Sequence, residues 1–292
     1  MFADACRTAS EFTHPVVTSV RRVDGTVQTS VGSFIVLNRD GWVLTAGHAY
    51  DSFVKFRGDA EKIKEIEELN RTRENRPGSP SSMIKLDPEF LTNHSFWWGW
   101  DGLRLNTVTV NRQLDIAVGK LEPFDPSLVS SYPVLADPSD AKVGTSLCRG
   151  GFAFSRFSSR WNDDKKAFEI PSIDSRSSVF FNDCILCRVR SDGPTFDRKY
   201  DLRYIETSTP GIKGQSGGPI FDRKGRLIGM QVRTDSIDLG FQPTAEMDGR
   251  TVVENQFINI GIGLHISVIR SFLDDLGVSY DSDGDEGFRI VG

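Results

Sequence analysis

The chain has 292 residues, a formal net charge of −5 and a pI near 5.5. Nucleic-acid binding generally needs a basic face, so this charge argues against a direct nucleic-acid partner. No run of about 18 apolar residues occurs, which excludes a membrane-spanning helix. Residues 1–7 lack the charged segment and apolar core of a signal peptide. We therefore expect a cytoplasmic protein with one large core or two small ones.

The first part of the chain has the pattern of β-strands. Residues 16–20 and 27–37 are rich in β-branched side chains. Residues 38–41 have the composition of a tight turn, with Gly41 supplying a positive φ. The strand after this turn leads to His48, and a rigid strand end suits a catalytic base.

Residues 52–106 are expected to form an insertion. Residues 59–76 have the pattern of a charged helix, with opposite charges at i,i+4 such as Lys64 and Glu68. An aromatic cluster follows at residues 96–100. We favour a small core of the insertion as its role; the alternative is a surface that binds a substrate or a partner.

The second half of the chain again predicts strands, at residues 134–136, 142–148, 179–189, 204–208 and 227–232. Residues 152–178 are polar, aromatic and irregular. Ser267 is predicted to cap a helix that ends near Leu276, where Gly277 stops it. Residues 278–292 are acidic and predict a solvated tail.

Four cysteines are scattered along the chain without the spacing of a disulfide framework. Cys184 and Cys187 form one Cys-x-x-Cys, but a zinc site would need two further ligands nearby and none is evident. We interpret these cysteines as small apolar residues on a strand, and we expect no metal and no cofactor.

The stretch of residues 210–221, Pro-Gly-Ile-Lys-Gly-Gln-Ser-Gly-Gly-Pro-Ile-Phe, places one hydroxyl, Ser216, in a run of glycines. Such a loop can turn several N–H groups toward one point and bind an anion. A serine there can attack a carbonyl while neighbouring N–H groups hold the oxyanion. Serine is a weak nucleophile without a base, so the loop requires one elsewhere.

Two upstream stretches supply the missing groups. Residues 44–48 end an apolar run with His48, and residues 114–118 embed Asp115 in an apolar strand. A buried carboxylate needs a partner, and a histidine N–H is a suitable one. The order His48, Asp115, Ser216 is that of chymotrypsin-type enzymes.

These blocks resemble those of a known family. Residues 45–48 (Thr-Ala-Gly-His), 115–117 (Asp-Ile-Ala) and 214–219 (Gly-Gln-Ser-Gly-Gly-Pro) are similar to the three catalytic blocks of the trypsin-like serine peptidases. Residues 32–45 and 261–266 resemble bacterial HtrA-like members in particular. The resemblance covers roughly residues 16–276. Too few residues follow the predicted helix for a PDZ domain.

The resemblance implies an all-β fold of two six-stranded antiparallel β-barrels, with a C-terminal helix and a helical and aromatic insertion in the first barrel. It implies a single peptidase domain. Its expected parts are the N-terminal barrel at 14–124, the C-terminal barrel at 125–265, the helix at 266–277 and the acidic tail at 278–292.

The resemblance also implies a serine endopeptidase that hydrolyses peptide bonds through an acyl-enzyme, with a limited set of substrates and a regulatory or stress role. His48, Asp115 and Ser216 would be catalytic, and the N–H groups of Gly214 and Ser216 would form the oxyanion hole. The expected partner is a protein or peptide substrate, with an activating protein as a further possibility.

The S1 pocket, which would hold the substrate side chain before the cleaved bond, is implied at five residues. They are Pro210, Lys213, Gln231, Arg233 and His265. Pro210 stands where enzymes for basic substrates carry an aspartate, so a preference for Lys or Arg is disfavoured. Three basic side chains would instead make the pocket positive and favour an acidic residue, unless they face solvent or the core.

The chain departs from trypsin-like zymogens at Gln215, where those proteins place an aspartate that pairs with a new N-terminus. We therefore expect no activation by that switch, and a loop that is either preformed or ordered by a partner. Two alternatives stay open: a protease-fold interaction module whose insertion binds another protein, and an HtrA-like chaperone-protease assembled through its N-terminal segment.

Overall fold

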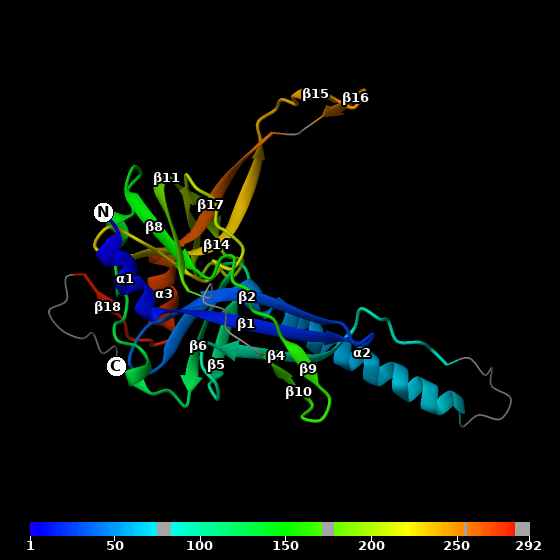
Figure 1. Cartoon of the computed structure of the whole chain (residues 1–292). Coiled ribbons are helices and arrows are strands. Elements are labelled where there is room, and N and C mark those ends of the chain that lie inside the picture. Colours follow the sequence, from blue (N-terminus) through cyan, green and yellow to red (C-terminus); the bar gives the residue numbers. More distant parts are fainter. Residues whose placement is uncertain (75–82, 171–177, 254–255, 284–292) are drawn as a thin grey trace.

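The computed structural model describes residues 1–74, 83–170, 178–253 and 256–283, and it is built around two β-sheets (Figure 1). The first sheet has the strand order β4-β1-β2-β3-β6-β5. Its strands are β1 (Thr13–Arg22), β2 (Val27–Val36), β3 (Trp42–Ala46), β4 (Leu91–Trp98), β5 (Arg104–Asn111) and β6 (Ile116–Glu122). All pairings in this sheet are antiparallel, and the sheet curves into a half-barrel.

Strand β2 carries the core of this half-barrel, because its residues Phe34, Ile35 and Val36 are all fully buried. The turn to β3 contains Gly41 with φ 82, and a Cβ there would come within 2.8 Å of the Phe124 ring. Only glycine fits both conditions. The predicted turn at residues 38–41 is therefore confirmed, and it fixes where β3 ends.

The second sheet has the order β13-β8-β11-β12-β17-β14-β7-β18, with a further pairing of β13 with β14. This pairing closes six strands into a ring, which leaves fewer strand edges exposed. The strands are β7 (Val134–Leu135), β8 (Ser146–Gly151), β11 (Phe180–Pro194), β12 (Asp201–Thr207), β13 (Pro219–Phe221), β14 (Leu227–Asp238), β17 (Phe257–His265) and β18 (Asp281–Ser282). The expected architecture of two six-stranded units followed by a helix is confirmed.

Helix α2 (Asp51–Glu74) begins earlier than the predicted helix at 59–76, directly after the short 3-10 helix η1 (Gly47–Tyr50). It is polar on nearly all sides and projects from the first sheet, as a solvated helix does (Figure 1). The predicted helix stop at Pro77 and Gly78 lies outside the described residues.

The aromatic cluster at 96–100 belongs to the first sheet and is not a separate core of the insertion. Strand β4 pairs with β1, with Trp98 opposite Val16 and Phe96 opposite Thr18. Alternation along the strand puts Phe96 and Trp98 on one face. The Trp98 ring packs against Phe34 with centroids 5.3 Å apart, so the aromatics complete the core of the half-barrel.

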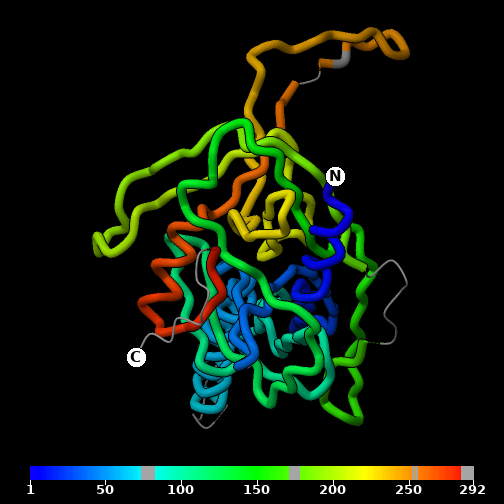
Figure 2. Tube along the Cα trace, turned by 90° about the vertical axis from the view of Figure 1, so that its left-hand side faces the viewer, coloured from blue at the N-terminus to red at the C-terminus, as the bar shows by residue number. Residues whose placement is uncertain are grey.

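Three features at the surface were not predicted. Helix α1 (Ala3–Phe12) buries Ala5, Ala9 and Phe12 against the sheets. Strands β14 and β17 extend as a long two-stranded arm that carries the hairpin β15 (Thr244–Met247)–β16 (Arg250–Val253) well away from the body in both views (Figures 1 and 2).

Residues 160–169, expected to be irregular, hold the small hairpin β9 (Arg160–Asn162)–β10 (Ala167–Glu169). Short 3-10 helices lie at η2 (Pro126–Leu128) and η3 (Pro138–Asp140).

The C-terminal helix α3 (Ile266–Asp275) is confirmed, and Gly277 with φ 66 follows its end. The prediction that Ser267 caps it is wrong. The N-cap is His265, whose Nδ1 accepts the Ser267 backbone N–H at 3.0 Å. None of the described helices is long and apolar enough to cross a membrane. Strand β18 lies within the predicted acidic tail, and residues 284–292 of that tail lie outside the described residues.

Candidate active site

His48 and Asp115 are in direct contact. His48 lies in η1, immediately after β3, and Asp115 lies in the turn between β5 and β6. The Asp115 carboxylate accepts from His48 twice: its Oδ2 is 2.9 Å from the ring Nδ1, and its Oδ1 accepts the backbone N–H at 2.8 Å. An ionised carboxylate at Nδ1 favours the tautomer with the proton there, which leaves Nε2 as an acceptor.

The backbone around this pair is closely packed. Asp115 has φ 54, a left-handed conformation that aspartate tolerates better than most residues. A Cβ on Gly47 would lie 3.0 Å from the backbone nitrogen of Ile116. Glycine at position 47 therefore lets the histidine segment approach the aspartate turn directly.

Ser216 lies on a loop that packs against the ends of β2 and β3. Its carbonyl accepts the Ser33 N–H at 2.8 Å. A Cβ on the next residue, Gly217, would come within 2.1 Å of the Ser33 oxygen and 2.4 Å of Thr45 Oγ1. The loop is thus held beside Thr45, on the strand that leads to His48.

The Ser216 hydroxyl itself is turned toward β14. Its Oγ is 3.4 Å from the carbonyl oxygen of Val232. Within the described part of the chain, it makes no hydrogen bond to His48. Catalytic hydrogen bonds are often long in unliganded enzymes and tighten only with substrate, so this geometry does not exclude a role for the pair.

Residues 212–215 form a tight turn closed by the Gln215 N–H, which donates to the Ile212 carbonyl at 2.9 Å. Gly214, the third residue of this turn, has φ 100. A positive φ at this place is the mark of a type II turn. The Gly214 carbonyl accepts from the Phe152 N–H at 3.1 Å and from Ser33 Oγ at 2.7 Å, which fixes its direction.

The backbone N–H groups of Gly214 and Ser216 have no hydrogen-bond acceptor among the described residues. An unpaired donor pair on neighbouring residues of a glycine-rich turn can bind an anionic oxygen. The turn geometry therefore leaves free the two donors that the sequence singles out.

Gln215 is fully buried and ties the turn to β11. Its Oε1 accepts the Ile212 N–H at 2.9 Å, and its Nε2 donates to Asn182 Oδ1 at 2.8 Å. A neutral amide thus holds this turn through buried hydrogen bonds. The sequence predicts that Gln215 cannot form the ion pair of the zymogens, and its observed partner Asn182 carries no sequence signal.

Arg149 is a further residue of this region that sequence reasoning missed. It is fully buried on β8, and its Nη1 donates to the carbonyls of Pro210 at 2.8 Å and Thr209 at 3.3 Å. Its Nη2 donates to Thr207 Oγ1 at 2.5 Å. Burial lowers the pKa of this guanidinium. It makes no ion pair with a described residue, so it acts as a clamp on the segment that enters the serine loop. An arginine inside the apolar run of β8 is the only signal that could have found it.

The other residues predicted for the S1 pocket are only partly available to a ligand. Gln231 is buried; its Nε2 donates to the Arg233 carbonyl at 2.7 Å, and a Cβ on Gly211 would lie 2.1 Å from that nitrogen. Arg233 Nε donates to an Asp235 carboxylate oxygen at 3.1 Å. Lys213 is exposed and makes no ion pair within the described ranges.

His265 is fully buried, and its ring belongs to the cap of α3 described above. Its Nε2 has no hydrogen-bond partner among the described residues. Burial, followed by the nearby charge of Arg203, lowers its pKa to about 4. The ring is therefore neutral near pH 7, which removes it as a source of positive charge for the predicted pocket.

We expect the free energy of unfolding to fall as the pH is lowered from about 6.5 to about 4. The folded protein holds His265 neutral over this range, while the unfolded chain takes up a proton at the ordinary pKa of 6.5, so acid favours unfolding.

His265→Asn keeps an N-cap acceptor and removes this titration. Urea unfolding at pH 7 and pH 5 should show a smaller fall in the variant. Some fall will remain, since burial also lowers the pKa values of His14 and His94 to about 4. An equal fall in both proteins would contradict this role.

All four cysteines are free, and on β11 Cys184 is buried while Cys187 is exposed. Over the described residues, no group of histidine, cysteine, aspartate or glutamate side chains is arranged to hold a metal ion.

Comparisons with known proteins identify the family of the chain. The model of the trypsin-like peptidase domain matches residues 32–230, and the chain belongs to this family. The crystal structure of the active form of the Rv3671c protease from M. tuberculosis is similar in fold, with 11% identity, coverage of 95% of this chain and 86% of that chain, and a TM-score of 0.50.

The HtrA-type protease AlgW, solved with a tripeptide, is another structural neighbour, with 14% identity and a TM-score of 0.48. The match covers 94% of this chain and 63% of AlgW, so this chain spans less than two thirds of that protein. No curated protein sequence matches the chain.

Proposed function

We propose that the protein is a serine endopeptidase that cleaves peptide bonds through an acyl-enzyme. The observation that carries this proposal is the 2.9 Å contact between His48 Nδ1 and the Asp115 carboxylate, on a fold of the trypsin-like peptidase family. The unpaired N–H groups of Gly214 and Ser216 on the adjoining loop support it.

In the proposed mechanism, Nε2 of His48 removes the proton of Ser216 as Oγ attacks the substrate carbonyl. Asp115 holds the imidazole in the required tautomer and stabilises the imidazolium that forms. The N–H groups of Gly214 and Ser216 bind the oxyanion. His48 then protonates the leaving amine. In the second half of the reaction, His48 takes a proton from water as the water attacks the acyl-enzyme, and it returns that proton to Ser216 Oγ as the ester bond breaks.

We further propose that the serine loop is formed without proteolytic activation. Two buried side chains hold the loop and the segment before it in place. Gln215 donates to Asn182, and Arg149 donates to the Pro210 carbonyl. These contacts need no new N-terminus. The substrates would be protein or peptide chains, and the role would be limited cleavage in regulation or stress.

For the S1 pocket we keep Pro210, Lys213, Gln231 and Arg233 as candidates, with the His265 ring occupied in the helix cap. Arg233 is paired with Asp235, so its charge is largely compensated. A preference for acidic residues therefore depends on Lys213, whose ammonium group is exposed.

Labelling with a fluorophosphonate probe tests the proposed function. Wild-type protein should label, whereas Ser216→Ala and His48→Ala should not, because the first lacks the nucleophile and the second lacks the base. Circular dichroism of all three proteins controls for folding. Labelling of Ser216→Ala at the wild-type rate would contradict the assigned nucleophile.

One observation favours a second candidate, a protease that becomes active only with a partner. The Ser216 hydroxyl is bonded to the Val232 carbonyl and not to His48. If folded wild-type protein does not label alone but labels with a bound protein partner, this second candidate is the correct one.

A further inference from the structure

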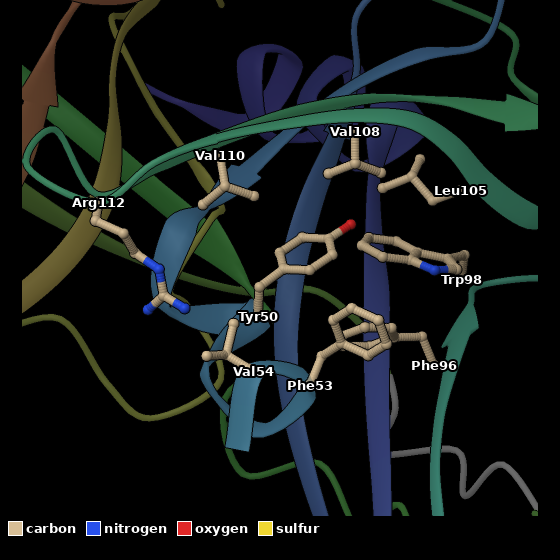
Figure 3. A pocket seen from close by; sticks show the side chains of 9 residues that line it. All are labelled: Tyr50, Phe53, Val54, Phe96, Trp98, Leu105, Val108, Val110 and Arg112. Atoms are coloured by element: carbon tan, nitrogen blue, oxygen red, sulfur yellow. The ribbon is translucent and has the colours of Figure 1, made fainter. Parts of the chain in front are cut away.

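Outside the proposed active site, an apolar groove lies where β4 and β5 face the start of α2 (Figure 3). Its lining is mainly aromatic and aliphatic, and Arg112, the charged residue in that lining, is paired with Asp51. The groove is open to solvent, and none of the described segments covers it. It therefore points to no particular ligand, in contrast to a pair of thiols at the N-terminal helix.

These two thiols come from distant parts of the sequence and meet between helix α1 and strand β8. The Sγ atoms of Cys6 and Cys148 lie 3.7 Å apart, although 142 positions separate them in the chain. Cys6 is partly exposed, whereas Cys148 is 3% exposed, and both thiols are free in this structure. The sulfurs of a disulfide lie about 2.0 Å apart, so an approach of about 1.7 Å would join them.

The packing of α1 keeps the two thiols close. Ala5 and Ala9 of the helix are buried in the same apolar cluster as Cys148. The Phe2 ring, just before the helix, packs edge-on against Phe221 with centroids 6.3 Å apart, and Phe221 is the residue that pairs with Cys148 from β13. The helix is therefore docked on the pair of strands to which Cys148 belongs.

Cys184 is the other buried thiol, and it lies on the opposite face of the sheet. Cys148 pairs with Asp183 across β8 and β11, and Cys184 pairs with Leu147. Neighbouring residues of a strand point to opposite faces. Accordingly, Cys184 and Leu147 belong to a second apolar cluster, separate from the one that contains Cys148. This leaves Cys6 as the thiol within reach of Cys148.

The difference in exposure sets the order in which the two thiols react with an oxidant such as hydrogen peroxide. Burial raises the pKa values of both thiols, so the reactive thiolate is a minor species near pH 7 and oxidation is slow. Cys6 reaches solvent and reacts first. Its thiolate attacks one peroxide oxygen, the O–O bond breaks, and hydroxide leaves, which gives a sulfenic acid on Cys6.

The buried thiol completes the reaction from inside the protein. The Cys148 sulfur attacks the Cys6 sulfur, the S–O bond breaks, and the oxygen leaves as water with the proton of Cys148. Two thiols and one peroxide thus give one disulfide and two water molecules. The two sulfurs together lose the two electrons that the peroxide gains.

A bond between these sulfurs would join two elements that support the serine loop. Helix α1 leads directly into β1, and β1 pairs with β2, where the Ser33 N–H donates to the Ser216 carbonyl. Cys148 immediately precedes Arg149, which holds the segment before that loop. The bond would also close a long loop of the chain, which restricts the unfolded state and stabilises the fold.

We propose that Cys6 and Cys148 form a reversible disulfide on exposure to peroxide, and that this disulfide fixes the N-terminal helix to the second sheet. In the reduced protein, noncovalent contacts alone hold α1 on β8. In the oxidised protein, the helix stays attached until a reductant cleaves the bond. The thiol pair does not depend on the proposed peptidase function, since it exists whether or not Ser216 reacts.

The full chain, first reduced and then treated with hydrogen peroxide in its native state, tests the proposal. Trypsin places Cys6 in peptide 1–7 and Cys148 in peptide 143–149, whereas both other cysteines fall in peptide 177–188. Mass spectrometry under non-reducing conditions should find peptide 1–7 linked to peptide 143–149. The Tm should rise by about 5 °C or more and return to its first value with dithiothreitol.

Cys187→Ser is the matched control, because it removes an exposed thiol on β11 and should keep both the link and the rise in Tm. Cys6→Ser should lose both. Circular dichroism checks that the variants fold, and the linked peptides of the wild type provide the test if Cys6→Ser does not fold. Absence of the link in oxidised wild type, or a link from Cys148 to Cys184 in its place, would overturn the proposed pair. A link that leaves the Tm unchanged would overturn the stabilising role.

Discussion

Asp115→Asn is expected to lower kcat/KM by about 10⁴, the effect that the loss of the correct histidine tautomer has in this type of triad. The Asp115 carboxylate accepts from both the backbone N–H and the ring Nδ1 of His48. Asparagine can still accept the backbone N–H through its oxygen. Its NH₂ group then faces Nδ1, which favours the tautomer with the proton on Nε2, and His48 can no longer accept the proton of Ser216.

Initial rates on a peptide substrate, with the free energy of unfolding measured in parallel, check this prediction. Asp137→Asn is a matched control: Asp137 accepts the Ser139 N–H at 2.8 Å in a short helix cap, and asparagine caps equally well. Both variants should fold with similar stability, and only Asp115→Asn should be inactive. A loss of less than tenfold in Asp115→Asn would show that Asp115 does not set the histidine tautomer.

Much of the candidate site could be predicted because each block is local in sequence. Gly47 and His48 are adjacent, and Gly214 and Ser216 lie in one loop, so the residue types alone carry the chemistry. The turn at 38–41 was predictable for the same reason. It needs one residue with a positive φ, and Gly41 supplies it within the turn itself. Local patterns of this kind can be recognised in the sequence by a reader who does not know the fold.

What could not be predicted depends on contacts between distant segments. Arg149 clamps the Pro210 carbonyl, and Gln215 bonds Asn182 on another strand. Asn182 is not marked by its neighbours in sequence, and Arg149 is marked only as an arginine inside the apolar run of β8. The aromatic cluster at 96–100 is ambiguous in the sequence for the same reason: it becomes a strand of the sheet only because β1 pairs with it.

The role of His265 illustrates a further limit. A histidine near the end of a strand and beside Ser267 is compatible with a ligand pocket and with a helix cap, and only the start of α3 at Ile266 decides between them. Serine is the more common N-cap, so propensity alone favoured the wrong residue. The tertiary position of the strand end overrode the propensity.

Gly214→Ala is expected to lower kcat/KM by about 10²–10³, the usual cost of losing one oxyanion donor. A Cβ on Gly214 would lie 2.3 Å from the Phe152 carbonyl oxygen and 2.8 Å from its carbon, and these are backbone atoms that cannot move aside cheaply. The φ of 100 at this residue adds strain for any side chain. The peptide unit before residue 214 must then rotate, and this rotation changes the direction of the Gly214 N–H.

Gly144→Ala separates this rotation from simple backbone strain. Gly144 has φ 90, and a Cβ there would meet nothing within 4 Å, so this variant carries the strain without the collision. It should lose about 1–2 kcal/mol of stability and keep its activity. Gly214→Ala should fold but lose activity, while Gly144→Ala should keep its activity. This result would show that catalysis requires the observed direction of the Gly214 N–H. Full activity in Gly214→Ala would mean that the oxyanion is held by other donors, because the observed turn cannot accept a side chain at residue 214 unchanged.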